Sequence, residues 1–450
     1  MLRRGDTGGT PVPRTDKTTI GPPSGQTGDL HMAQDTAPIL ASRTTPLWAV
    51  LSYTFLCSIG SGIVYAGVFF LAKYQYGFNE ADNFALGLLY GLTYIPAALS
   101  VGSVLRRLGR AGIAPRTLLG IVTTLMGTIC FVPWIIELLS SHSSHRATWP
   151  IWAIVAIYGP LSGAMWPIVE SFLAGGRSEG ELRSATGRFN VTWSSAIVLT
   201  LLAMAPLLEK HAMLLLNALG VVHLACVGIV ACFQKSPAAH EHHEHARPVI
   251  YKQLLTFLRL LLPVSFMFIS TISPYMPSAL ERMQIDASWQ TAIAAVWPAA
   301  RVAMFFTLER WHGWHGKWTT PIIGALLLIA AFVFLILVPP IAPAGFGLAL
   351  FLLGLIGFGI GVGIIYAAAL YYAVEVGSSG VDAGGTHEAL IGIGYTAGPI
   401  CGLAGLGAAS AGLVAKESAN LVMLGLVVAA ALGAGTFALA KAARMKRSGT

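Results

Sequence analysis

The chain has 450 residues, of which 55% are hydrophobic and only 11% are charged, and its mean hydropathy is +0.69. A water-soluble domain typically carries about 25% charged residues, so this composition excludes an ordinary soluble globular protein. The net charge of +8 would suit a nucleic-acid partner, but the distribution of the basic residues along the chain argues against one.

The first 45 residues are rich in Thr, Gly, Pro and Asp and lack the apolar core of a signal peptide. We therefore expect residues 1–45 to form a disordered leader on the cytoplasmic side of a membrane.

Twelve long apolar stretches follow the leader, and each approaches the ~20 residues that an α-helix needs to cross a bilayer. Each should be helical, because backbone groups that face lipid must be hydrogen-bonded within their own segment. The sequence therefore predicts an all-α polytopic membrane protein with twelve transmembrane helices in two pseudo-symmetric six-helix bundles. The expected spans are 46–72, 83–104, 115–139, 149–173, 190–208, 212–233, 254–276, 287–308, 319–341, 345–374, 387–413 and 418–440.

The longest internal polar loop, 234–253, divides the spans into bundles at 46–233 and 254–440, and a basic tail follows at 441–450. The loop carries a run of histidines within 240–245 that could bind zinc or nickel. A flexible polar linker explains the same composition, so no metal site and no cofactor are assigned.

Basic residues are distributed unequally between the two sets of loops. If the N-terminus is cytoplasmic, 22 of the 28 Lys and Arg residues lie on the inner side, five lie on the outer side and Arg301 lies within a span. This asymmetry follows the positive-inside rule and predicts a cell (inner) membrane protein with both termini in the cytoplasm. The five cysteines all fall in apolar spans, which argues against a disulfide framework.

The loop after the second span carries the most specific motif. It reads Gly102-Ser-Val-Leu-Arg106-Arg107-Leu-Gly109-Arg110 and resembles the Gly-x-x-x-Asp-Arg-x-Gly-Arg motif of the major facilitator superfamily. The family's Asp helps to latch the cytoplasmic gate, and here Arg106 occupies its position. The departure puts that latch in doubt.

Equivalent features recur in both halves. Glu309-Arg310 follows the eighth span, where it restores an acid–base pair, and Glu170-x6-Arg177 resembles an element of the family's sugar porters. Glu375 ends the tenth span as Glu170 ends the fourth, but Asp382 replaces the expected Arg at the same spacing. In the eleventh span, Gly394-x-x-x-Gly398-Pro399-x-x-Gly402 resembles the family's antiporter signature.

The resemblance implies two halves that rock around a site near mid-membrane and a gate at the cytoplasmic helix ends. We expect Glu170 to pair with Arg107 or Arg177; the alternative is that these are ordinary solvated helix-end charges. The gate candidates are Gly102, Arg107, Gly109, Arg110, Glu170, Arg177, Glu309, Arg310 and Glu375.

Arg301 is the one basic residue in the interior of a span, where a guanidinium is costly unless it faces water or a counter-charge. One interpretation is that Arg301 binds an anionic group of a substrate. The other is a structural ion pair with a buried acid such as Glu375 or Glu388.

Aromatic and amide side chains on the spans expected to line a central cavity would suit sugars or amphiphilic organic molecules; the alternative is interfacial anchoring or helix packing. Asn190 and Trp193 lie one helical turn apart and share a face. With Arg301, the substrate-binding candidates are Asn190, Trp193, Tyr65, Tyr94, Trp166, Tyr275, Trp297, Tyr366 and Tyr395.

No acid lies deep in the first, fourth, fifth or seventh expected span, which weakens a proton-driven mechanism because proton carriers usually keep a carboxylate in the membrane. His387 and Glu388 are the remaining candidates for proton coupling.

Together these features predict a secondary transporter of a small polar or amphiphilic organic solute: a sugar, organic anion, metabolite or drug. The alternatives are a non-transporting membrane sensor of the same fold and a polytopic membrane enzyme that uses His387 and Glu388. No catalytic residue is assigned. The expected partners are the lipid bilayer, a small-molecule substrate and a coupling ion, with the protein as a monomer; import and export both stay open.

Overall fold

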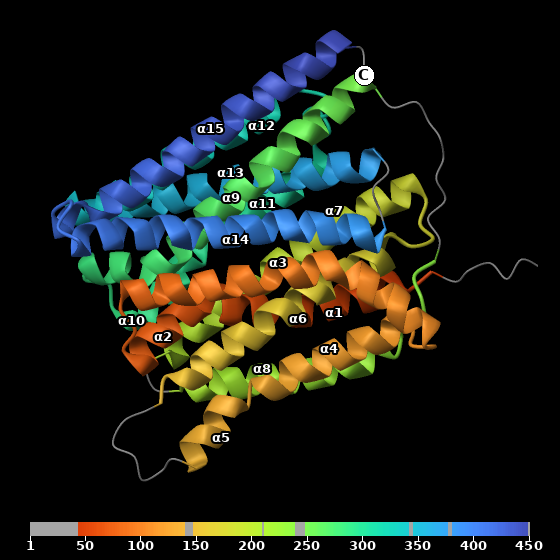
Figure 1. Cartoon of the computed structure of the whole chain (residues 1–450), viewed down its shortest axis with the longest axis horizontal. Coiled ribbons are helices and arrows are strands. Elements are labelled where there is room, and N and C mark those ends of the chain that lie inside the picture. Colours follow the sequence, from red (N-terminus) through yellow and green to blue (C-terminus); the bar gives the residue numbers. More distant parts are fainter. Residues whose placement is uncertain are drawn as a thin grey trace, which may run out of the picture. The chain divides into compact units, whose positions relative to one another are not determined.

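The computed structural model describes residues 44–139, 147–208, 211–238, 248–341, 345–376 and 380–448, and within these ranges the regular elements are all helical (Figure 1). Residues from Ser42 to Thr450 belong to one compact unit. The leader through residue 43 and the histidine run in 240–245 lie outside the described residues.

Six spans make up the N-terminal half. The first combines α1 (Leu47–Gly60), a π-helical segment η1 (Ser61–Gly67) and α2 (Val68–Tyr76). The others are α3 (Glu80–Arg110), α4 (Pro115–Ile129) with α5 (Val132–Leu139), α6 (Trp149–Ala174), α7 (Glu179–Met204) with η2 (Ala205–Leu207), and α8 (Ala212–Val230).

Six more spans make up the C-terminal half. They are α9 (Val249–Arg282), α10 (Ala287–Ala294) with α11 (Val296–Arg310), α12 (Thr319–Ile341), α13 (Phe346–Glu375), α14 (Val381–Ser410), and η3 (Lys416–Ser418) with α15 (Ala419–Ser448). The described residues thus contain 12 helical segments long and apolar enough to cross a membrane, which confirms the predicted number of spans. The basic tail predicted from residue 441 continues α15.

Several helices begin earlier than hydropathy predicts, and for two of them the difference matters for the site. The fifth span begins at Gly180 rather than at 190, and the eleventh begins at Val381 rather than at 387. Their first turns are polar because they contact the other half of the protein rather than lipid. Glu388 therefore lies about 10 Å along α14, at 1.5 Å per residue, and not at the helix end as predicted.

Local sequence signals define the turn between α2 and α3. Gly77 has φ of 70°, a left-handed conformation that a residue without a Cβ adopts readily. Asn79 then caps α3: its Oδ1 accepts from the amide of Asp82 at 3.0 Å, and Asp82 Oδ2 accepts from the amide of Asn79 at 3.0 Å. This reciprocal capping box satisfies two backbone donors at the start of a helix.

The two halves meet chiefly where α3 lies beside α14 (Figure 1). Small residues allow the two backbones to approach closely: a Cβ on Gly385 would lie 2.5 Å from the carbonyl oxygen of Ala98, and one on Gly91 would lie 2.7 Å from the amide nitrogen of Thr396. α14 also packs on α6 of the N-terminal half and on α9 and α15 of its own half, and α11 packs on α7. The boundaries assigned to the two bundles, 46–233 and 254–440, stay a prediction.

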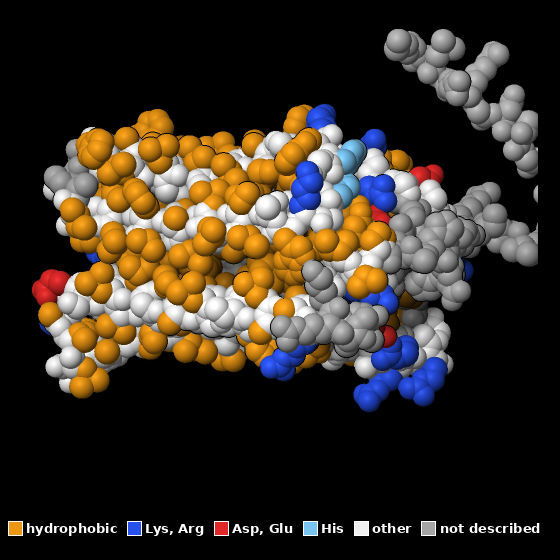
Figure 2. Space-filling model, turned by 90° about the horizontal axis from the view of Figure 1, so that it is seen from above, with side chains coloured by type: hydrophobic (Ala, Val, Ile, Leu, Met, Phe, Trp, Pro, Cys, Tyr) orange, Lys and Arg blue, Asp and Glu red, His pale blue; other side chains and the backbone are white. Residues whose placement is uncertain are grey.

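The surface is apolar along the helices and charged at one end. Figure 2 shows hydrophobic side chains over most of the visible face, with Lys and Arg gathered at one end of it. Many large hydrophobic side chains are more than half exposed, among them Leu99 on α3, Leu421 on α15 and Leu326 on α12. Such a band is stable only against lipid, so the chain is an integral membrane protein.

Candidate solute-binding site

A cavity of about 70 Å³ lies between the halves, and the structure brings most of the predicted substrate-binding residues to it. Its walls come from η1, α3, α6 and α7 of the N-terminal half and from α9, α11, α13 and α14 of the C-terminal half. The predicted residues that line this central cavity are Tyr65, Tyr94, Trp166, Trp193, Trp297, Arg301, Tyr366 and Tyr395.

Arg301 is the central charged group of the cavity and is only 2% exposed. Its Nε donates to the hydroxyl of Ser194 on α7 at 2.8 Å. The guanidinium carbon lies 4.3 Å from the ring centroid of Trp193 and 4.7 Å from that of Trp297, so it is held between two indoles. Cation–π contacts of this kind stabilise a desolvated guanidinium by about 2 kcal/mol or more.

The predicted ion pair between Arg301 and Glu375 or Glu388 is not formed. Glu375 instead accepts from Arg183 of α7, and Glu388 accepts from the hydroxyl of Tyr94. Arg301 Nη2 is buried and has no hydrogen-bond partner. A buried donor left unpaired costs about 1–3 kcal/mol, and more when it is charged, so the site is arranged to donate to an acceptor that enters the cavity.

Tyrosines close the cavity across the interface between the halves. The ring of Tyr65 lies 4.3 Å from that of Tyr395, centroid to centroid, and Tyr94 lies 5.5 Å from Tyr395. The hydroxyl of Tyr65 is also buried without a hydrogen-bond partner. The cavity therefore presents two unpaired donors, one from each half, among aromatic faces.

Two predicted substrate-binding residues lie elsewhere. Asn190 lines a separate cavity near the end of the molecule where α7 and α14 begin, which we call the inner end. Its Oδ1 accepts from Trp193 Nε1 at 3.2 Å, and this hydrogen bond orients the indole that stacks on Arg301. Tyr275 is buried near the opposite end of the molecule, where the guanidinium of Arg282 lies 5.3 Å from its ring. Tyr275 does not line the central cavity, because the order of residues along a helix does not by itself give their depth in the membrane.

Three titratable side chains meet at the inner edge of the central cavity. A carboxylate oxygen of Glu170 from α6, a carboxylate oxygen of Glu388 from α14 and a ring nitrogen of His387 from α14 all lie within 4.8 Å of one another. The predicted gate pairing of Glu170 with Arg107 or Arg177 is absent. Arg107 is exposed at the end of α3, whereas Glu170 lies among the side chains that line the cavity.

Arg177 has a structural role at the end of α6. Its guanidinium donates to the carbonyl oxygens of Phe172, Leu173 and Thr45, the last at 2.7 Å. It thereby satisfies carbonyl groups that the last turn of a helix leaves unpaired. Burial lowers the pKa of Arg177 from its usual range, and the side chain fixes the chain before α1 against the end of α6.

The inner helix ends of the two halves are joined by ion pairs that the motifs did not predict. Arg106 Nη1 lies 2.6 Å from Asp382 Oδ2 in the first turn of α14. A Cβ on Gly102 would overlap Asp382 Oδ1, so glycine at this position makes room for the acid. The second pair joins Arg183 Nη2 to Glu375 Oε1 at 2.5 Å.

At the first pair, the base comes from the N-terminal half and the acid from the C-terminal half. Arg106 stands where the motif has Asp, and Asp382 supplies the acid from the opposite half. The sequence analysis named Asp382 only as the replacement of an expected Arg and did not single out Arg183. Neither pairing could be predicted, because the partners lie 276 and 192 positions apart in the chain.

The remaining gate candidates make other contacts. Glu309 lies against Gly187 of α7, where a Cβ would be 2.8 Å from the carboxyl carbon. Arg310 lies over the ring of Phe306, 3.3 Å from its centroid. Arg110 is exposed, and the space around Gly109 is open within 4 Å. Of these four residues, only Glu309 reaches the opposite half.

The outer helix ends are joined by ion pairs as well. Lys73 Nζ lies 2.5 Å from Glu281 Oε2, and Arg282 Nη2 lies 2.5 Å from Glu80 Oε2. Each pair crosses from the N-terminal half, at α2 or α3, to the end of α9. The halves are thus held together at both ends of the cavity.

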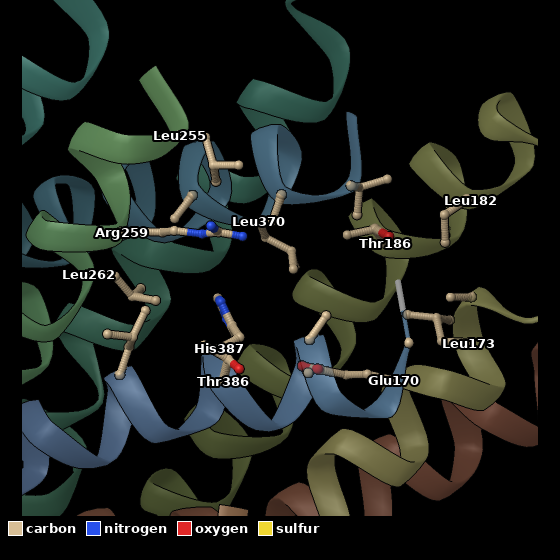
Figure 3. A pocket seen from close by; sticks show the side chains of 18 of the residues that line it. Glu170, Leu173, Leu182, Thr186, Leu255, Arg259, Leu262, Leu370, Thr386 and His387 are labelled. Atoms are coloured by element: carbon tan, nitrogen blue, oxygen red, sulfur yellow. The ribbon is translucent and has the colours of Figure 1, made fainter. Parts of the chain in front are cut away.

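Two further cavities lie toward the inner end of the molecule. The first, of about 80 Å³, shares Glu170 with the central cavity and also contains Arg259 and His387. Figure 3 shows His387 pointing from α14 toward Arg259 of α9. The second measures about 330 Å³ and is lined by Asn190 and the Arg183–Glu375 pair, among others.

His315 lines the larger inner cavity, and its surroundings determine its charge. His315 stacks on Tyr371 with centroids 4.2 Å apart and planes at 14°. Burial, followed by the nearby His312 and Arg183, lowers the pKa of His315 to about 4. The imidazole is therefore neutral near pH 7 and acts as an aromatic wall of this cavity.

Comparison with known proteins identifies the fold. No protein-family model and no curated protein matches the chain. Solved structures do: the nucleoside transporter NupG matches with a TM-score of 0.59 and 11% identity over 86% of this chain and 98% of that chain. A point mutant of NupG matches with a TM-score of 0.60 and 12% identity over the same shares. The chain therefore shares the fold of this nucleoside transporter, as expected for twelve membrane-spanning helices.

Proposed function

We propose that this protein is a secondary transporter that carries a small organic solute across the membrane by alternating access between its two halves. The observation that supports this most directly is Arg301, whose Nη2 is buried without a partner beside a cavity formed by both halves. The fold, shared with a nucleoside transporter, supports the same function.

The chemistry of the cavity suggests the class of solute. The guanidinium of Arg301 and the hydroxyl of Tyr65 each supply a donor that lacks a partner, and the indoles and phenols around them offer flat apolar faces. We infer a polar or amphiphilic molecule with a flat body and an anionic or strongly accepting oxygen. Nucleosides and aromatic organic anions both have this character.

The state of the structure is consistent with a carrier that is closed at the outer end. Most of the cavity space, about 330 Å³ and 80 Å³, lies on the inner side. We propose that this side faces the cytoplasm of a cell whose inner membrane holds the protein as a monomer, and that the direction of net transport follows the solute and ion gradients.

The test is thermal unfolding of the purified protein in detergent with nucleosides, sugars, organic anions and cationic drugs. A molecule that binds only the folded state stabilises it by about 2.7 kcal/mol at a hundredfold excess over its Kd. Arg301→Ala should weaken that binding by about 10- to 100-fold, since a hydrogen bond to a charged group contributes about 1.5–3 kcal/mol. Arg301→Lys should fall between, because lysine keeps the charge but not the planar fork.

Arg310→Ala is the matched control, because Arg310 is on the same helix but outside the cavity. A stabilising molecule whose affinity is unchanged in both Arg301 variants would show that Arg301 is structural. Flux of the stabilising molecule into vesicles then separates a carrier from a sensor: binding without flux would contradict transport.

A further inference from the structure

A carboxyl group from each half of the protein meets the other at the inner edge of the central cavity. Glu170 belongs to α6 and Glu388 to α14. A carboxylate oxygen of each acid and a ring nitrogen of His387 lie within 4.8 Å of one another. Glu388 is 5% exposed. A Cβ on Gly384 would lie 2.9 Å from Glu170 Oε2, so glycine there lets the acid lie against α14.

Two adjacent carboxylates in a poorly hydrated site cannot both be ionised at neutral pH without strong repulsion, and such pairs share one proton. The hydroxyl of Tyr94 donates to Glu388 Oε2 and stabilises one negative charge. A single hydrogen bond does not stabilise two adjacent negative charges. The favoured state of the pair is one proton and one negative charge.

The other charged and titratable groups around the pair support this assignment. Arg259 faces the adjoining inner cavity from α9 (Figure 3), and Arg301 is held by Ser194 and its two indoles. Tyr366 of α13 and Tyr395 of α14 line the central cavity beside the pair. None of these four groups is a carboxylic acid, so the repulsion arises between Glu170 and Glu388 themselves.

We propose that Glu170 and Glu388 bind one exchangeable proton between the two halves, and that this proton controls opening of the inner end. While the proton is present, the pair joins α6 to α14. When it leaves, two negative charges face each other and push the helices apart. The proton moves from a carboxyl oxygen of the pair to solvent, so no other reactant is required.

His387 gives the proton a route to the inner side. Its Nε2 is buried without a hydrogen-bond partner, and the side chain lines the inner cavity that shares Glu170 with the central one. Glu170, Glu388 and Arg301 all line the central cavity. If the proposed transport function holds, the proton is then the coupling ion, since one opening movement would respond to both the proton and the solute.

The shared proton can be detected without any solute, so the result of this experiment is independent of the proposed transport function. Infrared spectroscopy of the purified protein across pH should show one protonated carboxyl band that disappears as the pH rises. Glu170→Gln and Glu388→Gln should each shift its titration to lower pH, because each removes the repelling neighbour, and the double variant should lack it. Glu417→Gln, at an exposed acid on the outer side, is the control. A band that survives the double substitution would overturn the proposal.

The opening is tested by cysteine labelling. Thr186 lines both inner cavities, so Thr186→Cys in a variant without the five native cysteines reports access from the inner side. Labelling by a maleimide should become several-fold faster as the pH rises, and this dependence should vanish when Glu170→Gln and Glu388→Gln are combined. An unchanged pH dependence would contradict the gate.

A divalent cation is the competing occupant, because two carboxylates and an imidazole are also metal ligands. Titration with Mn²⁺ decides between them. Micromolar binding that is lost in both glutamine variants would assign the site to a metal ion and overturn the proton; no binding to the wild type supports the proton.

Discussion

At the scale of single residues, the position of Arg301 depends on a glycine in the neighbouring helix. A Cβ on Gly359 of α13 would overlap the carbonyl oxygen of Trp297 on α11. The two backbones are therefore in direct contact at this level. Trp297 stacks on Arg301, which lies one turn further along α11. The contact between Gly359 and Trp297 therefore positions the indole of Trp297 and, through it, the guanidinium of Arg301.

We expect Gly359→Ala to destabilise the protein by about 1–3 kcal/mol, the usual cost of overpacking, and to weaken binding of any solute that contacts Arg301. Gly407→Ala is the matched control, because no atom lies within 4 Å of the Cβ that it would add; its effect should stay within about 1 kcal/mol. Thermal unfolding of both variants checks this, and equal losses of stability would contradict it.

Sequence reasoning identified most residues of the central cavity because intramembrane charge and aromatic residues are conspicuous in an apolar chain. It did not identify Ser194 as the partner of Arg301 or Glu170 as the partner of Glu388. Serine is common in membrane helices, and Glu170 was placed in a gate on the strength of a motif. Which side chains meet across two halves depends on helix rotation and depth, which periodicity does not give.

At the scale of elements, α3 and α14 form a continuous seam between the halves, and the pair of Arg106 and Asp382 lies at its inner end. Both side chains are well exposed, at 61% and 68%. An exposed pair contributes only about 0.2–1 kcal/mol. Its value therefore lies in helping to set which helix ends face each other rather than in overall stability.

Charge reversal tests this pairing. Arg106→Asp and Asp382→Arg should each destabilise the protein by placing like charges together, and the double reversal should recover most of the loss, with a coupling energy of about 0.2–1 kcal/mol. Arg110→Asp, at the same helix end, should show no coupling to Asp382→Arg. A double-mutant cycle of unfolding free energies gives the result, and strictly additive single effects would contradict the pairing.

The elements themselves were predicted well, because long apolar segments leave little choice of structure in lipid. The starts of α7 and α14 were not, since their first turns are polar. Hydropathy treats polarity as the end of a span, yet these turns face the opposite half. The same error placed His387 and Glu388 at a helix end, whereas both lie within α14, close to Glu170 of α6.

At the scale of the whole molecule, the orientation in the membrane is a prediction: an even number of spans and the positive-inside rule together predict that both chain ends face the cytoplasm. Two alanines of matched exposure probe the two sides: Ala111 follows α3 at the inner end, and Ala411 follows α14 at the outer end. A membrane-impermeant maleimide should label Ala411→Cys on intact cells and Ala111→Cys only after permeabilisation. The reverse pattern would invert the orientation.

The small volume of the central cavity has a consequence for the cell as a whole. At about 70 Å³, it has room for only a few water molecules, and ion pairs close the molecule around it at both ends. A continuous column of water through such a protein would let ions leak and discharge the membrane. Aromatic rings line this cavity, so under the proposed transport function the empty protein would insulate the bilayer, and a solute would have to displace those rings in order to cross.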